Sequence, residues 1–220
     1  FISLYMFFFF IILVFKNKSK LFYSPISGKR YSVSVLIPAY NEEDSIAGTI
    51  DHVLNLDYPK EKLEIIVIND GSKDRTKEII LKYMKKFKNV KLLDKPNSGK
   101  ADSLNKGIEM SKGELIAVVD SDSFPSEGSL RKLVGFFDNP AMGAVTSFVS
   151  VRNSDEGILI RIQEIEYLIM GWARKVLDFV DSVYVTNGPL SVYRKEYVIK
   201  VGGFDTKSIT EDIDITWNML

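Results

Sequence analysis

Three short apolar segments, each followed by polar residues and set among helical patterns, constrain the fold of this chain more than any other feature. The segments cover residues 33–37, 65–68 and 115–119. The second and third are continuous apolar runs, which are typical of strands covered on both faces. Helical patterns lie at 42–56 and 74–87, after the first two segments, and at 101–110, after a further short strand that is expected at 90–93. This alternation predicts an α/β domain with a mainly parallel sheet and helices on both faces.

Ligands of such sheets bind beyond the carboxyl ends of the strands. The polar residues that directly follow the three segments are Pro38-Ala39-Tyr40-Asn41-Glu42, Asn69-Asp70-Gly71-Ser72 and Asp120-Ser121-Asp122. We therefore expect all three clusters to lie at one edge of the sheet and to form a single site.

Asp120 and Asp122 are spaced by two residues, so in an extended segment their side chains point the same way. Two adjacent carboxylates repel each other, and a divalent cation removes that penalty. Mg²⁺ favours one or two carboxylates together with substrate phosphate oxygens and water. The alternative is an acidic turn that caps a helix.

Asp70 and Lys100 are candidate ligand-binding residues. Asp70 is expected either to form a turn with Gly71 or to accept a hydrogen bond from a ring N–H or hydroxyl of a ligand. Lys100 is placed to meet a phosphate, although its surroundings do not form a P-loop. The sequence also lacks a GxGxxG motif, which weakens a dinucleotide-binding hypothesis.

The segment Thr210-Glu211-Asp212 opens the last helical stretch. Thr210 suits an N-cap with acidic residues in the first turn. An aspartate at this place is also a candidate general base if it faces the pocket, which makes Asp212 the residue of interest. The chain has no cysteine and a single histidine, His52, which excludes disulfides, thiolate metal sites and sites built from several imidazoles. We expect His52 to pack within a helix.

Residues 1–15 are apolar and uncharged, and we expect a transmembrane helix there. Fifteen helical residues span roughly 22 Å, short of the ~30 Å hydrocarbon core, but the sequence does not begin with Met, so we expect the helix to be truncated at its start. A buried core helix and a signal peptide are the alternatives. A basic linker at 16–32 would follow, and its lysines predict that the next domain lies on the cytoplasmic side of the cell membrane.

Charge is distributed unevenly along the chain. The net charge is zero, but no acidic residue precedes Glu42, and residues 31–220 carry a net charge of −5. Because phosphate neutralisation needs a basic face, this body is a poor general nucleic-acid binder.

Six segments, taken in order, resemble those of family 2 glycosyltransferases of the GT-A fold: VSVLIPAYNEE, IIVINDGSKDRT, NSGKADSLNKGI, VVDSDS, NGPLSVYR and TEDIDITW. Within the family, the sequence is most similar to membrane-embedded synthases of β-linked polysaccharides such as poly-N-acetylglucosamine, hyaluronan, chitin and cellulose. The resemblance covers residues 33–220 and implies a GT-A domain over that range. Such synthases continue with a QxxRW motif and further membrane helices, so we expect this chain to be a fragment that is truncated before that motif.

The resemblance implies a role for each matching residue. Pro38, Tyr40 and Glu42 line the nucleotide pocket. Asp70 contacts uracil and Lys100 the diphosphate. Asp120 and Asp122 hold the ribose and a divalent metal, Mg²⁺ or Mn²⁺. Gly188 and Glu211 lie near the acceptor sugar, and Asp212 is the proposed base.

The activity implied by the resemblance is that of a metal-dependent inverting hexosyltransferase. It would move a sugar, expected to be N-acetylglucosamine, from a UDP-sugar donor to a growing β-linked glycan acceptor at the lipid bilayer. The alternatives are single transfer to a polyprenyl phosphate and a catalytically inactive nucleotide-binding membrane subunit. The sequence leaves open the donor sugar, the linkage position, the choice of metal and the oligomeric state.

Residues 157–180 show apolar residues at helical spacing. Two roles are considered for this amphipathic helix: packing in the core, and contact with the membrane surface or with further helices.

Overall fold

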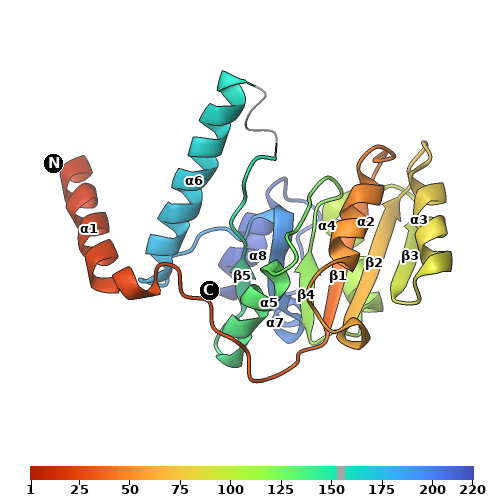
Figure 1. Ribbon diagram of the computed structural model, residues 1–220, viewed down its shortest axis with the longest axis horizontal. Coiled ribbons are helices and arrows are strands. Elements are labelled where there is room, and N and C mark those ends of the chain that lie inside the picture. The colour runs from red at the N-terminus through yellow and green to blue at the C-terminus, as the bar shows by residue number, and fades with distance from the viewer. Residues whose placement is uncertain (153–156) are drawn as a thin grey trace. The chain divides into compact units, whose positions relative to one another are not determined.

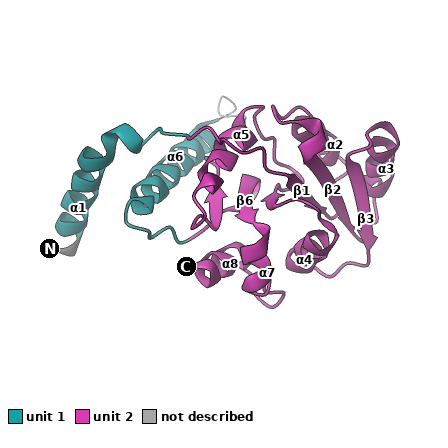
Figure 2. Cartoon of the chain, turned by 90° about the horizontal axis from the view of Figure 1, so that it is seen from below, with its two compact units in different colours: residues 1–24, 148–184 teal, residues 25–147, 185–220 magenta. Residues whose placement is uncertain are grey.

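The computed structural model describes residues 1–152 and 157–220. The chain divides into two compact units (Figure 2). Unit 1 comprises residues 1–24 and 148–184, and unit 2 comprises residues 25–147 and 185–220. Unit 2 contains the sheet and all the predicted strand-end clusters.

The sheet of unit 2 has six strands in the order β3-β2-β1-β4-β6-β5 (Figure 1). The strands β1 to β4 run parallel, and β6 pairs antiparallel with both β4 and β5. The mixed, mainly parallel α/β sheet expected from the sequence is therefore confirmed. The strands are β1 (Val33–Ala39), β2 (Leu63–Asp70), β3 (Val90–Lys95), β4 (Leu115–Val118), β5 (Ala144–Thr146) and β6 (Ser191–Arg194).

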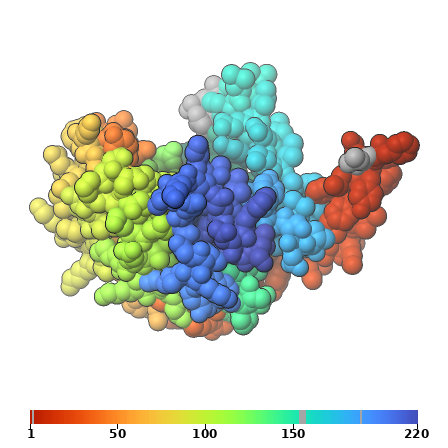
Figure 3. Space-filling model, turned by 180° about the vertical axis from the view of Figure 1, so that it is seen from behind, coloured from red at the N-terminus to blue at the C-terminus, as the bar shows by residue number. Residues whose placement is uncertain are grey.

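Helices cover both faces of this sheet. They are α2 (Ile46–Leu54), α3 (Thr76–Lys86), α4 (Lys100–Met110), α5 (Ser129–Val134), α7 (Lys195–Lys200) and α8 (Glu211–Met219). Short 3-10 turns are η2 (Lys60–Lys62), η3 (Gly135–Asp138) and η5 (Gly188–Leu190). Figure 3 shows α4 beside the blue residues of α7 and α8 on one side of unit 2.

Alternating residues of the central strands feed two cores. Val35 and Ile37 of β1 pack with α2, α3 and α5, while Leu36 packs on the other face with α4, α7 and α8. The same alternation holds in β2, where Ile65 and Ile66 face opposite cores. Because both faces are covered, these strands are apolar without a break.

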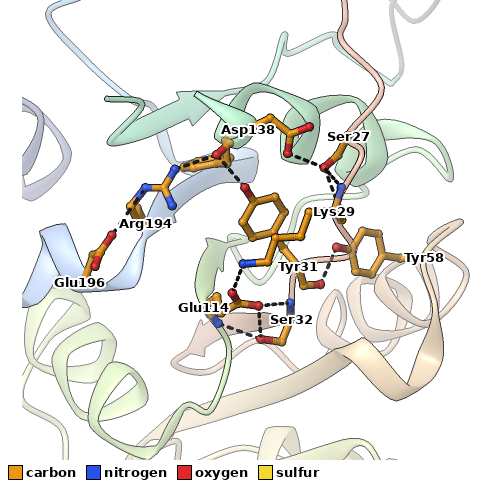
Figure 4. A network of polar contacts seen from close by, with 10 residues as sticks. Ser27, Lys29, Tyr31, Ser32, Tyr58, Glu114, Asp138, Arg194 and Glu196 are labelled. Carbon is orange, nitrogen blue, oxygen red and sulfur yellow. Dashed lines mark hydrogen bonds and ion pairs between the residues drawn. The ribbon is translucent and has the colours of Figure 1, made fainter. Parts of the chain in front are cut away.

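Residues 25–32, the second part of the predicted basic linker, belong to unit 2 and pack against the rest of it (Figure 4). Tyr31 donates a hydrogen bond of 2.8 Å to the carbonyl of Phe137, and Ser27 donates one of 2.7 Å to Asp138. Ser32 and Lys29 contact Glu114, which lies directly before β4. We call residues 25–32 the strap. It lies at the amino ends of the strands, so it is at the edge opposite the predicted site.

Unit 1 contains α1 (Ile2–Asn17), the 3-10 turn η1 (Lys18–Lys20) and α6 (Ile158–Asp178). The two helices contact each other, and the rings of Phe10 and Trp172 stack with centroids 6.1 Å apart. The transmembrane helix expected at residues 1–15 is not supported. The helix there has 16 residues, and within the described ranges none of the helices combines the length and the apolar character needed to cross a membrane.

The helix expected over residues 157–180 is present as α6, but its apolar side chains are mostly exposed. The exposed residues are Ile158, Leu159, Ile162, Ile165, Leu168, Ile169, Met170 and Trp172, whereas Val176 is buried. Core packing therefore does not describe most of this helix.

Candidate functional site

The three strand-end clusters meet around one pocket of about 300 Å³ in unit 2. Its lining consists of Pro38, Ala39, Tyr40, Glu42, Asp70, Lys100, Ser103, Asp120, Ser121 and Asp122. The expectation that the clusters converge at one edge of the sheet is therefore confirmed. Seven predicted site residues line the pocket, and their individual roles stay predictions.

The loops that follow β1 and β2 brace each other at the pocket. Asn41 accepts a hydrogen bond from the Lys73 amide at 2.8 Å, and its own amide donates to Ser72 Oγ at 3.0 Å. Glu42 is held in the same way, because its amide donates to Thr76 Oγ1 at 2.8 Å. Asn41 has a φ of 56°, a conformation that asparagine tolerates better than most residues. The backbone that presents Tyr40 and Glu42 is thus fixed from two sides.

Asp70 ends β2 and is buried under the loop that leads into α4. Its two oxygens accept hydrogen bonds from the amides of Ser98 and Gly99, both at 2.9 Å. The ammonium of Lys95 lies against the same carboxylate. The sequence hypothesis gave Asp70 a ligand-binding or turn-forming role and did not include Lys95. The sequence signal for Lys95 was that a lysine and an aspartate end two strands that follow each other in the chain. The structure shows that these strands are neighbours and that their register pairs Asp70 with Lys95.

Lys100 is the first residue of α4 and reaches across the pocket. It follows Gly99, whose φ of +95° favours glycine. Its Nζ lies 2.7 Å from Asp120 Oδ1 and 3.4 Å from Glu211 Oε1. Burial lowers the pKa of Lys100, but the charges and hydrogen bonds of Asp120 and Glu211 outweigh it, and the pKa lies above its ordinary value. A protonated lysine at this place provides a positive charge for an anionic ligand.

The Asp120-Ser121-Asp122 loop is anchored from α2. Thr49 is fully buried and donates a hydrogen bond of 2.7 Å to the carbonyl of Ser121. One turn along α2, the ring of His52 packs against Phe124 at 5.0 Å, in agreement with the packing role expected for it. Sequence reasoning missed Thr49, because a threonine inside a helix carries no signal that it points to a distant loop.

Two pocket carboxylates, Asp120 and Asp122, are candidates for holding a divalent cation. No cluster of three or more histidine, cysteine or acidic side chains suited to a metal ion occurs in the parts of the chain that the structure describes. Two carboxylates nevertheless suit Mg²⁺ or Mn²⁺ when phosphate oxygens and water complete the coordination. The donor set therefore fits a metal that binds together with a phosphorylated ligand.

Among the described residues that line the pocket, neither Glu211 nor Asp212 is found. Glu211 reaches it through Lys100, while Asp212 Oδ1 accepts a hydrogen bond from the amide of Ile213 at 2.9 Å. Thr210 precedes α8, but its side chain makes no capping hydrogen bond. Gly188 lies in η5, which leads into β6.

A buried hydroxyl cluster of Thr186, Tyr193 and Thr216 connects these two regions. Thr186 Oγ1 lies 2.9 Å from the Tyr193 hydroxyl and 2.8 Å from Thr216 Oγ1. Thr216 also donates to the carbonyl of Asp212 at 2.6 Å. Burial raises the pKa of Tyr193, which keeps its hydroxyl protonated. The cluster fixes the first turn of α8 against the chain that leads to Gly188.

The site thus combines a pocket of the size that binds small molecules, a cationic lysine and a pair of carboxylates. This combination suits a ligand with a phosphate group bound together with a divalent cation.

The family model and the similar proteins point to the same family. Residues 34–202 match the model of the family described as Glycosyl transferase family 2. The chain is 36% identical over 190 residues to a poly-beta-1,6-N-acetyl-D-glucosamine synthase of Staphylococcus epidermidis, covering 85% of this chain and 45% of that protein. It is 37% identical over 193 residues to the probable glycosyltransferase YdaM of Bacillus subtilis, covering 84% and 45%. The chain thus spans about half the length of these curated relatives.

Solved structures show the same fold at low sequence identity. The mannosyltransferase PcManGT of Pyrobaculum calidifontis, in complex with GDP-Man and Mn²⁺, superposes with a TM-score of 0.71 at 21% identity, covering 96% of this chain and 59% of that one. Residues 1–349 of TarS from S. aureus, in complex with UDP-GlcNAc, give a TM-score of 0.62 at 22% identity, covering 86% and 53%.

Proposed function

This chain belongs to glycosyl transferase family 2, and from that premise we propose that it forms the donor-binding part of an inverting glycosyltransferase. The donor is UDP-N-acetylglucosamine, and the product is a β-linked glycan to which the enzyme adds sugar units. The proposal depends above all on one observation: Asp70, Lys100, Asp120 and Asp122 line a single pocket, and Lys100 joins it to the start of α8. The names of the synthase relatives support the choice of sugar and product.

Different pocket residues are proposed to bind different parts of the donor. Pro38, Tyr40, Glu42 and Asp70, which all line the pocket, are proposed to contact the nucleotide. Lys100 meets the diphosphate, where its positive charge stabilises the negative charge that develops on the leaving group. Asp120 and Asp122 would hold Mg²⁺ or Mn²⁺, which supplies further stabilisation of that charge when bound.

Asp212 is the proposed general base. Its carboxylate takes the proton of the acceptor hydroxyl while that oxygen forms a bond to the anomeric carbon. The bond from the anomeric carbon to the phosphate oxygen breaks at the same time, and UDP leaves with its electron pair. Attack from the face opposite UDP inverts the configuration, so an α-linked donor gives a β-linked product. Gly188 and Glu211 are proposed to lie beside the acceptor sugar.

The proposed enzyme works at a membrane, with this domain on the cytoplasmic side. The membrane is proposed because the synthases that the sequence resembles are membrane-embedded, and the side because Lys16, Lys18 and Lys20 make residues 16–20 basic, as is usual for cytoplasmic segments of membrane proteins.

The decisive experiment identifies the product. Membranes that contain the full-length protein are incubated with labelled UDP-sugars and Mg²⁺ or Mn²⁺, and the labelled material is characterised by size and by enzymatic digestion. We expect a polymer of β-linked N-acetylglucosamine and release of UDP, and EDTA should abolish both. A product limited to a lipid-linked monosaccharide would overturn the polymerase proposal, and absence of UDP release with every donor would overturn transfer.

Asp212→Asn tests the proposed base. We expect the variant to bind UDP as the wild type does and to lose transfer by roughly 10²- to 10⁴-fold, the range typical of general base catalysis. Asp214→Asn, two residues further along α8, is the matched control. Unchanged transfer by Asp212→Asn would remove this residue from the mechanism.

A further inference from the structure

Lys95, the last residue of β3, is a buried charged residue to which the proposed mechanism gives no role. Only 6% of its side chain is exposed. Its ammonium forms ion pairs with two carboxylates, that of Asp70 and that of Asp102, the latter at 3.1 Å. It also donates to the side chain of Ser98. A buried lysine persists only when it is paired in this way.

The partners of Lys95 all belong to the structure that supports the loop of residues 96–99. The carboxylate of Asp70 accepts hydrogen bonds from the amides of Ser98 and Gly99. Asp102 binds the Ser98 hydroxyl from the first turn of α4. That hydrogen bond and the Lys95 ammonium hold the pKa of Asp102 below its ordinary value. Lys95 thus lies at the centre of a cluster that fixes Ser98 and Gly99, the part of the loop that directly precedes Lys100.

This loop decides where Lys100 points. Gly99 ends the loop with a φ of +95°, and Lys100 follows as the first residue of α4. On the other side, the turn at Gly71 packs so closely against Asn97 that an added Cβ would lie 2.6 Å from its amide nitrogen. Any shift of residues 96–99 would therefore move the lysine that contacts Asp120 and Glu211.

We propose that Lys95 is a positioning residue of the donor site, which acts through Asp70 and the 96–99 loop to hold Lys100 toward the diphosphate of the donor. The inference deepens the proposed function and rests on it. Lys95 is not among the described residues that line the pocket, so it would act through its neighbours. Its charge offsets the repulsion between Asp70 and Asp102, and without it these carboxylates would separate and release the amides of Ser98 and Gly99.

The test uses the full-length protein and three variants. Lys95→Met removes the charge and keeps much of the side-chain volume, and Lys95→Arg keeps the charge. Lys91→Met is the matched control, because Lys91 lies on the same strand but pairs with Glu64, away from the pocket. Binding of UDP in the presence of Mn²⁺ is measured by calorimetry. Hydrogen–deuterium exchange reports the amides of Ser98 and Gly99.

For Lys95→Met we expect UDP affinity to fall by roughly 10- to 100-fold, the loss typical of residues that orient a binding group from behind. The two loop amides should exchange faster, and Lys95→Arg should recover at least part of both properties. Lys91→Met should behave as the wild type. Wild-type affinity together with protected amides in Lys95→Met would overturn the proposal.

A double-mutant cycle separates positioning from a general structural effect. If Lys95 acts through Lys100, Lys95→Met should weaken UDP binding much less when Lys100 is already replaced by methionine. Full additivity would overturn the proposal. If Lys95→Met does not fold, Lys95→Gln takes its place, because glutamine lacks the charge but can still hydrogen-bond to Asp70 and Ser98. Lys95→Gln should also lose affinity, and wild-type affinity in it would overturn the proposal.

Failure of the proposed function gives a different result. A wild-type protein that binds no UDP would overturn the donor assignment, while the exchange of the Ser98 and Gly99 amides would still decide whether Lys95 holds the loop.

Discussion

Lys100 Nζ lies 2.7 Å from Asp120 Oδ1, so a lysine at the start of α4 is paired with a carboxylate at the end of β4. The same ammonium lies 3.4 Å from Glu211 at the start of α8. One side chain therefore connects the donor pocket with the helix that carries the proposed base.

Replacing Lys100 by methionine should weaken UDP binding by roughly 10- to 100-fold, because a hydrogen bond to a charged group contributes about 1.5–3 kcal/mol. Calorimetric titration with UDP and Mn²⁺ measures the change. Lys106→Met is the control, because Lys106 is exposed on the same helix. Equal affinities in Lys100→Met and the wild type would show that Lys100 does not meet the diphosphate.

Thr49→Val should destabilise unit 2 by about 1–3 kcal/mol, because it leaves the carbonyl of Ser121 without its donor in a buried place. The loop that carries Asp120 and Asp122 should also bind Mn²⁺-UDP more weakly. Urea unfolding and UDP titration measure the two effects. Thr49→Ser keeps the hydroxyl and should retain most of the affinity, and an equal loss in both variants would argue for packing alone.

Thr216→Val should slow sugar transfer and leave UDP affinity nearly unchanged. The substitution keeps the shape of the side chain but removes the hydroxyl that binds the Asp212 carbonyl and accepts from the Thr186 amide at 3.0 Å. Steady-state kinetics of the full-length protein should show the fall in kcat. Thr216→Ser should restore it, and an unchanged kcat in Thr216→Val would contradict a role in placing α8.

Glu64 should make folding stability fall in acid. Burial raises the pKa of Glu64, but hydrogen bonds from Lys91, Ser34 and the Lys112 amide outweigh it, so the pKa lies below its ordinary 4.5. A pKa that is lower in the folded state stabilises the fold above pH 4.5, and the contribution is lost as the pH falls through the lowered pKa. Urea unfolding between pH 3 and 7 should show this loss. Glu64→Gln should reduce it, and Glu61→Gln, at an exposed position, should not.

The parts of the site that the sequence predicted are those that depend on local pattern. The ends of the continuous apolar strands can be located in the sequence, so the convergence of Glu42, Asp70 and Asp122 follows once the strands are taken to run parallel. Contacts set by register are different. Lys95 meets Asp70 because β3 pairs with β2 in one register, and no local pattern specifies that pairing.

Two further differences have physical reasons. Residues 25–32 are polar and contain Pro25 and Gly28, which are typical of a linker, yet their partners Glu114 and Asp138 lie about a hundred residues away in the chain. The apolar stripe of α6 suits a buried helix, but apolar spacing alone does not specify what covers the stripe.

The strap has a practical consequence for producing the sheet-containing part of the chain without residues 1–32. A recombinant version that starts at Val33, where the first strand begins, would discard Tyr31 and the chain whose Pro25 carbonyl oxygen lies 1.8 Å from where a Cβ on Gly135 would be. That would uncover Phe137, which is only 1% exposed, and newly exposed apolar surface promotes aggregation. Starting upstream of Pro25 keeps this surface covered.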